Sequence, residues 1–308
     1  MRSMPSPGAL LCLASAAAFG AMGIFGKLAY DEGASVGTLL ATRFVLAAVL
    51  FWLVVACSGR TRRLRALPRR DVGIALALGA VGYSAQAGAY FAALDRLDAS
   101  LLSLLVYTFP AIVTVSAIAL GRERASRRTA LALVLASTGL VLVLAGAAAG
   151  ALDPIGTALG LAAAFVYSAY ILTSEGVAAR LGPLALGTLV CTGAATTLTL
   201  GGAVTGDLDL GGVSAEGFGW LAGIAVVSTV GAVGLFFAGL QRVGPTAASI
   251  LSTLEPVVTV VLAFVVFGES LGPIQLAGGA LVLLAVLAVR TPVRVAVVAP
   301  PSASRVGA

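Results

Sequence analysis

One carboxylate, Glu255, lies inside an otherwise uncharged apolar stretch at residues 245–268. At about 1.5 Å per helical residue it lies ~15 Å into that stretch, half of a bilayer core of roughly 30 Å. A charge at that depth is costly and is expected to face a bundle interior or water. Ser252 shares its helical face, and Pro256 removes one backbone hydrogen bond, which predicts a bend. Such a carboxylate could hold a coupling proton or contact a cationic group of a solute.

A second costly ion, Arg43, follows Ser35 by eight residues and therefore lies ~12 Å from the other edge, close to the depth of Glu255. Each is the natural partner of the other, so we expect them to approach within direct or one-water reach across a cavity in at least one state. A purely structural ion pair is the alternative. Lys27 and Glu175 lie near the ends of apolar stretches and are expected to extend to the membrane surface.

Stripes of amphipathic side chains accompany these two ions. They are Tyr83, Gln86 and Tyr90 on residues 72–94, Tyr107 on 98–121, and Tyr167 and Tyr170 on 154–176. Helical spacing places each set on one face, so these stretches and 245–267 are expected to line a cavity. The plainer alternative is that hydroxyl groups bond neighbouring backbone and that the rings only pack. Together these side chains suit recognition of a polar organic solute.

The composition identifies an integral membrane protein, because 59% of residues are hydrophobic, 10% are charged and the mean hydropathy is +1.06. There is no histidine and no cluster of cysteine or acidic residues at ligand spacing, so we expect no metal and no cofactor. No phosphate-binding loop is present. Cys12, Cys57 and Cys191 lie within apolar stretches and are interpreted as core residues, not disulfides.

Ten apolar stretches are long enough to cross a bilayer and are joined by short connections, which predicts an all-α, polytopic membrane protein. They are residues 8–28, 35–57, 72–94, 98–121, 129–149, 154–176, 183–204, 217–240, 245–267 and 271–290. The first could instead be a signal peptide, but its length and its place in the repeat described below argue against cleavage.

Charge alternates between the connections. Six arginines lie within residues 58–71 and four within 122–128, whereas acidic residues gather at 31–32, 95–98 and 207–216. The positive-inside rule therefore predicts a multi-pass protein of the cell membrane with both termini cytoplasmic. The net charge of +6 is explained by this topology, and no nucleic-acid partner is expected.

An internal repeat relates the two halves at an offset of 146 residues. It aligns Arg96 with Arg242, Pro110 with Pro256, and Glu123 with Glu269. We expect a first five-helix repeat at 1–149, a second at 150–292, and a disordered cytoplasmic tail at 293–308. An odd number of spans in each half gives the halves opposite orientations, so this is an inverted-topology repeat of the kind found in secondary transporters.

The doubled patterns ALDRLDASLLSLLVYTFP…GRE at 93–123 and GLQRVGPTAASILSTLEP…FGE at 239–269, with TRF at 42–44, resemble the EamA type of the drug/metabolite transporter superfamily. The resemblance covers nearly the whole chain. It implies a ten-helix carrier with cytoplasmic termini and a central cavity, commonly used to export amino acids or related metabolites. The chain departs from a symmetric pattern where Phe109 takes the place of Glu255 and Val190 stands near the counterpart of Arg43.

These observations predict a secondary transporter of a small organic metabolite, exporting by rocking of the two halves about a midplane cavity, with proton coupling as one option. A membrane scaffold or receptor that does not transport is the alternative, although it gives no reason for buried ions in an inverted repeat. An intramembrane enzyme would need a nucleophile and base or metal ligands at membrane depth, and we identify none.

Overall fold

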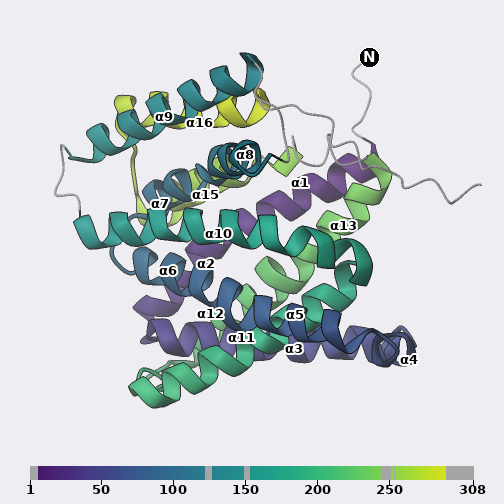
Figure 1. Cartoon of the computed structure of the whole chain (residues 1–308). Coiled ribbons are helices and arrows are strands. Elements are labelled where there is room, and N and C mark those ends of the chain that lie inside the picture. The colour runs from purple at the N-terminus through teal and green to yellow at the C-terminus, as the bar shows by residue number, and fades with distance from the viewer. Residues whose placement is uncertain (1–5, 122–126, 149–152, 244–250, 253, 289–308) are drawn as a thin grey trace, which may run out of the picture.

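The computed structural model describes residues 6–121, 127–148, 153–243, 251–252 and 254–288. The regular secondary structure of these residues is entirely helical, with no strand among them (Figure 1). Seven helices are long and apolar enough to cross a membrane, and three shorter apolar helices accompany them. The prediction of an all-α, polytopic architecture is therefore confirmed. The predicted tail at 293–308 and the connection at 244–250 lie outside the described residues.

The first half contains five helical segments, three of them interrupted. They are α1 (Pro7–Gly20) with α2 (Met22–Asp31); α3 (Val36–Cys57); α5 (Arg69–Ala77), the π-helical turn η1 (Leu78–Tyr83) and α6 (Ser84–Leu94); α7 (Ala99–Val106) with α8 (Phe109–Ala119); and α9 (Arg127–Ala148). A short helix, α4 (Thr61–Arg65), lies in the arginine-rich connection. Most ends lie within a few residues of the predicted ones.

The second half repeats this order. It contains α10 (Pro154–Leu181); α11 (Pro183–Thr205); α12 (Ala215–Ala225), the π-helical turn η2 (Val226–Gly231) and α13 (Ala232–Val243); α15 (Leu254–Phe267); and α16 (Pro273–Ala288). The ninth stretch was predicted to begin at residue 245, and its described helix α15 begins two residues before Pro256. The two π-helical turns fall in corresponding helices of the two halves.

Packing between the halves follows a pseudo-two-fold pattern. Helix α9 packs on α16 and α3 on α11, and Figure 1 shows these pairs along opposite edges of the bundle with α10 between them. The contact of α1 with α13 is matched by that of α10 with α6, and the contact of α1 with α15 by that of α10 with α8. Equivalent helices thus exchange partners across the halves, and the central helices α1 and α10 each contact the opposite half.

A close approach of small residues holds the outermost pair. A side chain at Gly139 of α9 would lie 2.6 Å from the carbonyl oxygen of Gly278 on α16, and the reverse distance is also 2.6 Å. Only glycine allows two helix backbones to approach so closely, which is how membrane helices gain packing energy without a hydrophobic driving force.

Interruptions within the spans are the main departure from regular helices. In η1 the hydroxyl of Ser84 donates to the carbonyl oxygen of Gly79 at 2.9 Å, and in η2 that of Thr229 donates to Ile224 at 3.0 Å. These bonds satisfy carbonyl groups that a π-helical turn leaves without a regular partner. The fourth span breaks at Tyr107–Thr108, just before Pro110, which has no backbone N–H to donate.

Candidate functional site

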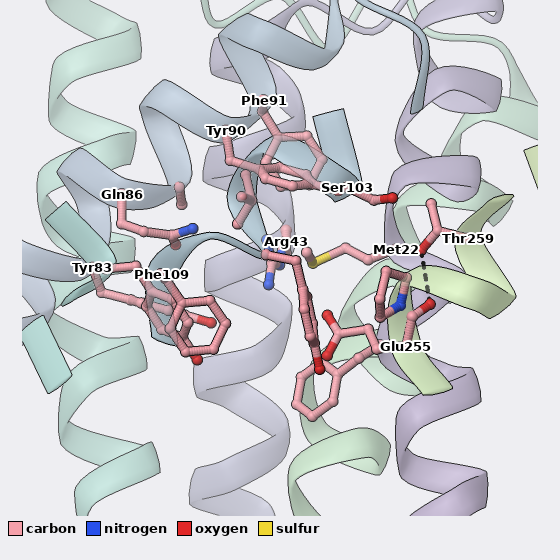
Figure 2. Close-up of a pocket in the computed structure, with 16 residues that line it drawn as sticks. Met22, Arg43, Tyr83, Gln86, Tyr90, Phe91, Ser103, Phe109, Glu255 and Thr259 are labelled. Atoms are coloured by element: carbon pink, nitrogen blue, oxygen red, sulfur yellow. Dashed lines mark hydrogen bonds between the residues drawn. The ribbon is translucent and has the colours of Figure 1, made fainter. Parts of the chain in front are cut away.

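Two adjoining cavities lie between the halves, one of about 140 Å³ and one of about 500 Å³. Both are lined by Phe19, Tyr83, Tyr107, Phe109, Tyr167 and Glu255. Figure 2 shows the smaller cavity, into which side chains of the first half and of α15 project. The site is therefore built from both repeats, as expected for a midplane site between inverted halves.

Each residue singled out from the sequence lines one or both of these cavities. The smaller one contains Arg43, Tyr83, Gln86, Tyr90, Tyr107, Tyr167 and Glu255; the larger one shares Tyr83, Tyr107, Tyr167 and Glu255 and adds Tyr170 and Ser252. The structure thus brings these side chains together, and their roles in binding or coupling remain a prediction. For Tyr107, the alternative that hydroxyl groups bond neighbouring backbone also applies. Its hydroxyl donates to the Ser252 carbonyl oxygen at 2.8 Å.

Glu255 lies in the first turn of α15, where the positive end of the helix dipole favours a negative charge. Its side chain extends toward the interior of the cavity (Figure 2). Among the described residues, none forms an ion pair or a hydrogen bond with this carboxylate. Thr259, one turn later, donates to the carbonyl oxygens of Gly20 and Glu255, which holds α15 against α1. Glu255 is therefore positioned but has no charged partner within the described chain.

Arg43, in contrast, has a hydroxyl group and two aromatic rings as neighbours. Its side chain is almost fully enclosed, with the residue 3% exposed, and its Nε donates to the Thr229 hydroxyl at 3.0 Å. Its guanidinium carbon lies 4.9 Å from the ring centroid of Phe44 and 5.3 Å from that of Phe91, a cation–π arrangement. No ion pair within 4.0 Å joins Arg43 to Glu255 in the described residues. Their direct approach in another state stays a prediction.

A continuous set of aromatic rings forms one wall of the site. The ring of Phe109 lies edge-on to those of Tyr107 and Tyr167, with centroids 5.8 and 4.7 Å apart. Tyr167 stacks on Tyr170 at 6.4 Å, and Tyr170 contacts Tyr83 at 5.6 Å. Helices α8 and α10 and the π-helical turn η1 are thereby joined around the cavity.

Sequence reasoning missed several lining residues, namely Phe19, Phe51, Phe236, Phe237 and Thr229. Phe109 was noted only as a departure from symmetry. Aromatic residues make up just 6% of the chain, so their presence within predicted spans was a usable signal. No sequence signal pointed to Thr229, because its position beside Arg43 depends on the π-helical turn η2.

Lys27 contacts acidic residues of two connections between spans, Asp98 before α7 and Glu269 after α15. That its side chain extends to the membrane surface stays a prediction. Its Nζ lies 2.8 Å from Oε1 of Glu269 and 3.8 Å from Asp98. Glu269 also accepts hydrogen bonds from the backbone N–H groups of Ala99 and Ser100 and from the Ser100 hydroxyl. Burial alone would raise the pKa of Glu269, but the bonds from Lys27 and Ser100 outweigh it and hold that pKa below its usual value. The side chain of Glu175 lies outside the described residues.

The larger cavity extends toward one end of the bundle. Its lining runs from Glu255 to Pro183, Leu186 and Gly187 at the start of α11, the end at which the arginines of residues 60–70 also lie. The opposite, acidic end is linked across the halves: Glu32 accepts from the Ser214 hydroxyl, and Asp207 accepts from the backbone of Gly37 at 2.7 Å. The cavity is thus directed toward the arginine-rich end.

The description of the family model that matches this chain is "EamA-like transporter family", and the matches cover residues 6–145 and 154–291. The chain is 27% identical over 280 residues to an uncharacterized transporter, YcbK, of Bacillus subtilis (strain 168), covering 88% of each protein. It is 29% identical over 198 residues to an uncharacterized transporter of Archaeoglobus fulgidus, covering 64% of this chain and 69% of that protein.

A solved crystal structure superposes with a TM-score of 0.64 at 17% identity, covering 92% of this chain and 96% of the other, which shows a shared fold. The two family matches correspond to the two halves of the helical bundle. The protein is therefore a multi-pass membrane transporter, not an enzyme, and it belongs to the EamA-like transporter family.

Proposed function

We propose that this transporter exports a small organic metabolite, an amino acid or a related compound, by alternating access. The observation that carries the proposal is the Glu255 carboxylate, which faces a cavity lined by both repeats and has no partner among the described residues. A charge without a partner at membrane depth is energetically costly, and such charges commonly serve binding or ion coupling. Either a proton or a positively charged solute would neutralise it, and competition between the two would couple their movements.

Export is supported by the direction of the cavity. The arginine-rich end toward which the larger cavity extends is the end that the positive-inside rule assigns to the cytoplasm. In this state solute would enter from the cytoplasm, with both termini on that side. Residues 1–149 and 150–292 would then rock against each other about the cavity and open the acidic end.

Transport itself is tested with purified protein in proteoliposomes. Metabolites inside and outside cells with and without the protein are compared first, to identify a solute. Flux of that solute is then measured with and without a pH gradient, for wild type, Glu255→Gln and the exposed control Glu216→Gln. We expect wild-type protein to transport the solute. Glu255→Gln should abolish this flux or make it independent of the pH gradient, and Glu216→Gln should leave it unchanged.

Two results would count against the proposal. A protein that binds the solute without moving it across the bilayer would be a receptor or scaffold. A stably folded Glu255→Gln variant with full flux and unchanged pH dependence would make Glu255 a structural residue only.

A further inference from the structure

The charge that lines the larger cavity is of one sign, negative. Its 19 lining residues include one charged side chain, Glu255, in the part of the chain that the structure describes. Arg43 does not line this cavity; it lines the smaller one. A solute in the 500 Å³ space therefore meets a carboxylate and no cation, and that volume lies in the range of small-molecule sites.

Aromatic rings supply much of the remaining lining. Nine of the 19 residues are phenylalanine or tyrosine, in a chain of which 6% is aromatic. The faces of such rings carry partial negative charge and attract cations, and the attraction is strongest where water is excluded. The rings of Tyr107, Phe109 and Tyr167 contact one another and line the cavity together with Glu255. The rings and the carboxylate thus both favour a positively charged solute.

Arg43 would oppose a cation if its charge were free, but the structure directs that charge elsewhere. Its guanidinium lies over Phe44 and Phe91 and donates to Thr229. Since the residue is 3% exposed, little of the group reaches the cavity surface. A solute carboxylate in the larger cavity does not meet this group, because Arg43 lines only the smaller cavity.

We propose that the substrate is an organic monocation, an amine on an apolar or aromatic body, and not a zwitterionic amino acid. The amine pairs with Glu255 while its body lies against the rings around Phe109 and Tyr167. A zwitterion would bring a carboxylate into a space with no free cation, and burying an uncompensated charge is costly. This inference rests on the proposed transport function and narrows its solute from amino acids and related compounds to the related amines.

The test compares three ligands that share one ring and differ in charge: phenethylamine, which is a cation, phenylalanine, which is a zwitterion, and phenethyl alcohol, which is neutral. Their affinities for the purified full-length protein are measured by calorimetry at pH 7. We expect phenethylamine to bind about tenfold or more tightly than either of the others, the ratio that one net charge-assisted contact produces. Equal or tighter binding of phenylalanine would overturn the proposal without any variant.

Substitutions then locate the selectivity. Glu255→Gln is expected to remove the preference for phenethylamine, and Glu255→Asp to retain it, while the matched change Glu216→Gln at an exposed position leaves all three affinities unaltered. Phe109→Leu should weaken phenethylamine binding about three- to tenfold. Its control is Phe165→Leu on α10, a ring that is 60% exposed and outside both cavities. A cation preference that survives in folded Glu255→Gln would place the site elsewhere.

Different results would contradict the transport function and the cation site. Uptake is measured against protein-free liposomes, because the neutral form of phenethylamine crosses a bilayer unaided. If the protein speeds the uptake of phenylalanine and not that of phenethylamine, the transport function stands and the cation site is wrong. If phenethylamine binds with the expected selectivity but the protein speeds the uptake of neither compound, the cation site stands and the transport function is wrong.

Discussion

The two ends of the bundle are held in different ways. At the acidic end polar contacts join the halves at several points, including Lys27 with Glu269, Glu32 with Ser214, and Thr38 with the carbonyl oxygen of Asp209. At the arginine-rich end the described residues form one such ion pair, Arg180 with Asp71, and the larger cavity extends there. Closure at the acidic end thus depends on polar contacts, which water can replace when the end opens.

A second difference concerns corresponding pairs of helices. The third and sixth spans are linked at both ends, by Arg96 with Asp153 and by Asp71 with Arg180. Their counterparts are the eighth and first spans, which lack the equivalent of the first link in the described residues. Arg242, which aligns with Arg96, donates instead to the carbonyl oxygen of Ala238 in its own helix. We infer that the third and sixth spans move as a unit and that the first and eighth are freer to separate.

The largest effect is expected at Glu269. Replacing it with alanine leaves Lys27 without its close partner and removes acceptors from two backbone N–H groups at the start of α7. Since the Glu269 side chain is 7% exposed, we expect a loss of about 2–4 kcal/mol in the free energy of unfolding. Thermal unfolding of the purified protein in detergent measures it.

Two variants sharpen that result. Lys27→Met leaves Glu269 with its bonds to α7 and should cost less than Glu269→Ala. Glu216→Ala, an exposed acidic residue at the same end, should be close to neutral. If Glu269→Ala is as stable as Glu216→Ala, the cluster around Lys27 does not hold this end closed.

Access to the cavity is expected to differ between the two ends. In a background without Cys12, Cys57 and Cys191, a cysteine at Leu186 or Ser103 should react with a membrane-impermeant thiol reagent from the arginine-rich side, because both positions line the cavities. A cysteine at Glu216 should react from the opposite side. Vesicles of both orientations measure these rates and also test the cytoplasmic location of the termini. Rapid reaction at Leu186 from the acidic side would reverse the direction of the cavity.

The sequence predicted most of the fold because hydrophobic length and charge alternation are set along the chain. The span from 183 to 204, for example, differs from α11 by one residue at its end. The predicted depth of Glu255 depends only on its distance from the ends of an apolar stretch. The same reasoning placed Arg43 at a similar depth, and both line the smaller cavity.

Contacts that depend on rotation about a helix axis could not be predicted in this way. A π-helical turn shifts every later side chain around the axis, so the meeting of Thr229 with Arg43 was not visible in the spacing. The pairing of Lys27 with Glu269 was not predicted either, because the two residues are 242 positions apart along the chain. Equal depth is necessary for two ions to pair, but the direction in which each side chain points decides whether they do.

The smallest effect is expected at Asp153, whose contact with Arg96 is partly exposed on both sides. The Asp153 carboxylate also accepts from the backbone N–H groups of Ile155 and Gly156 at the start of α10. Asparagine can keep these N-terminal bonds and lose only the ion pair, so Asp153→Asn should shift the melting temperature by less than about 2 °C. Asp153→Ala loses both contacts and should shift it further.

The pH dependence of these variants separates the two contributions of Asp153. The bond from Gly156, with those from Arg96 and Ile155, holds the pKa of Asp153 below its usual value. A depressed folded-state pKa stabilises the protein above the unfolded-state value of about 3.9, and this stabilisation is lost as the pH falls through the folded-state pKa. Melting temperatures measured from pH 6 down to about pH 3 should therefore converge for wild type and Asp153→Asn. A constant gap between them over that range would show that the ionised carboxylate does not stabilise the acidic end.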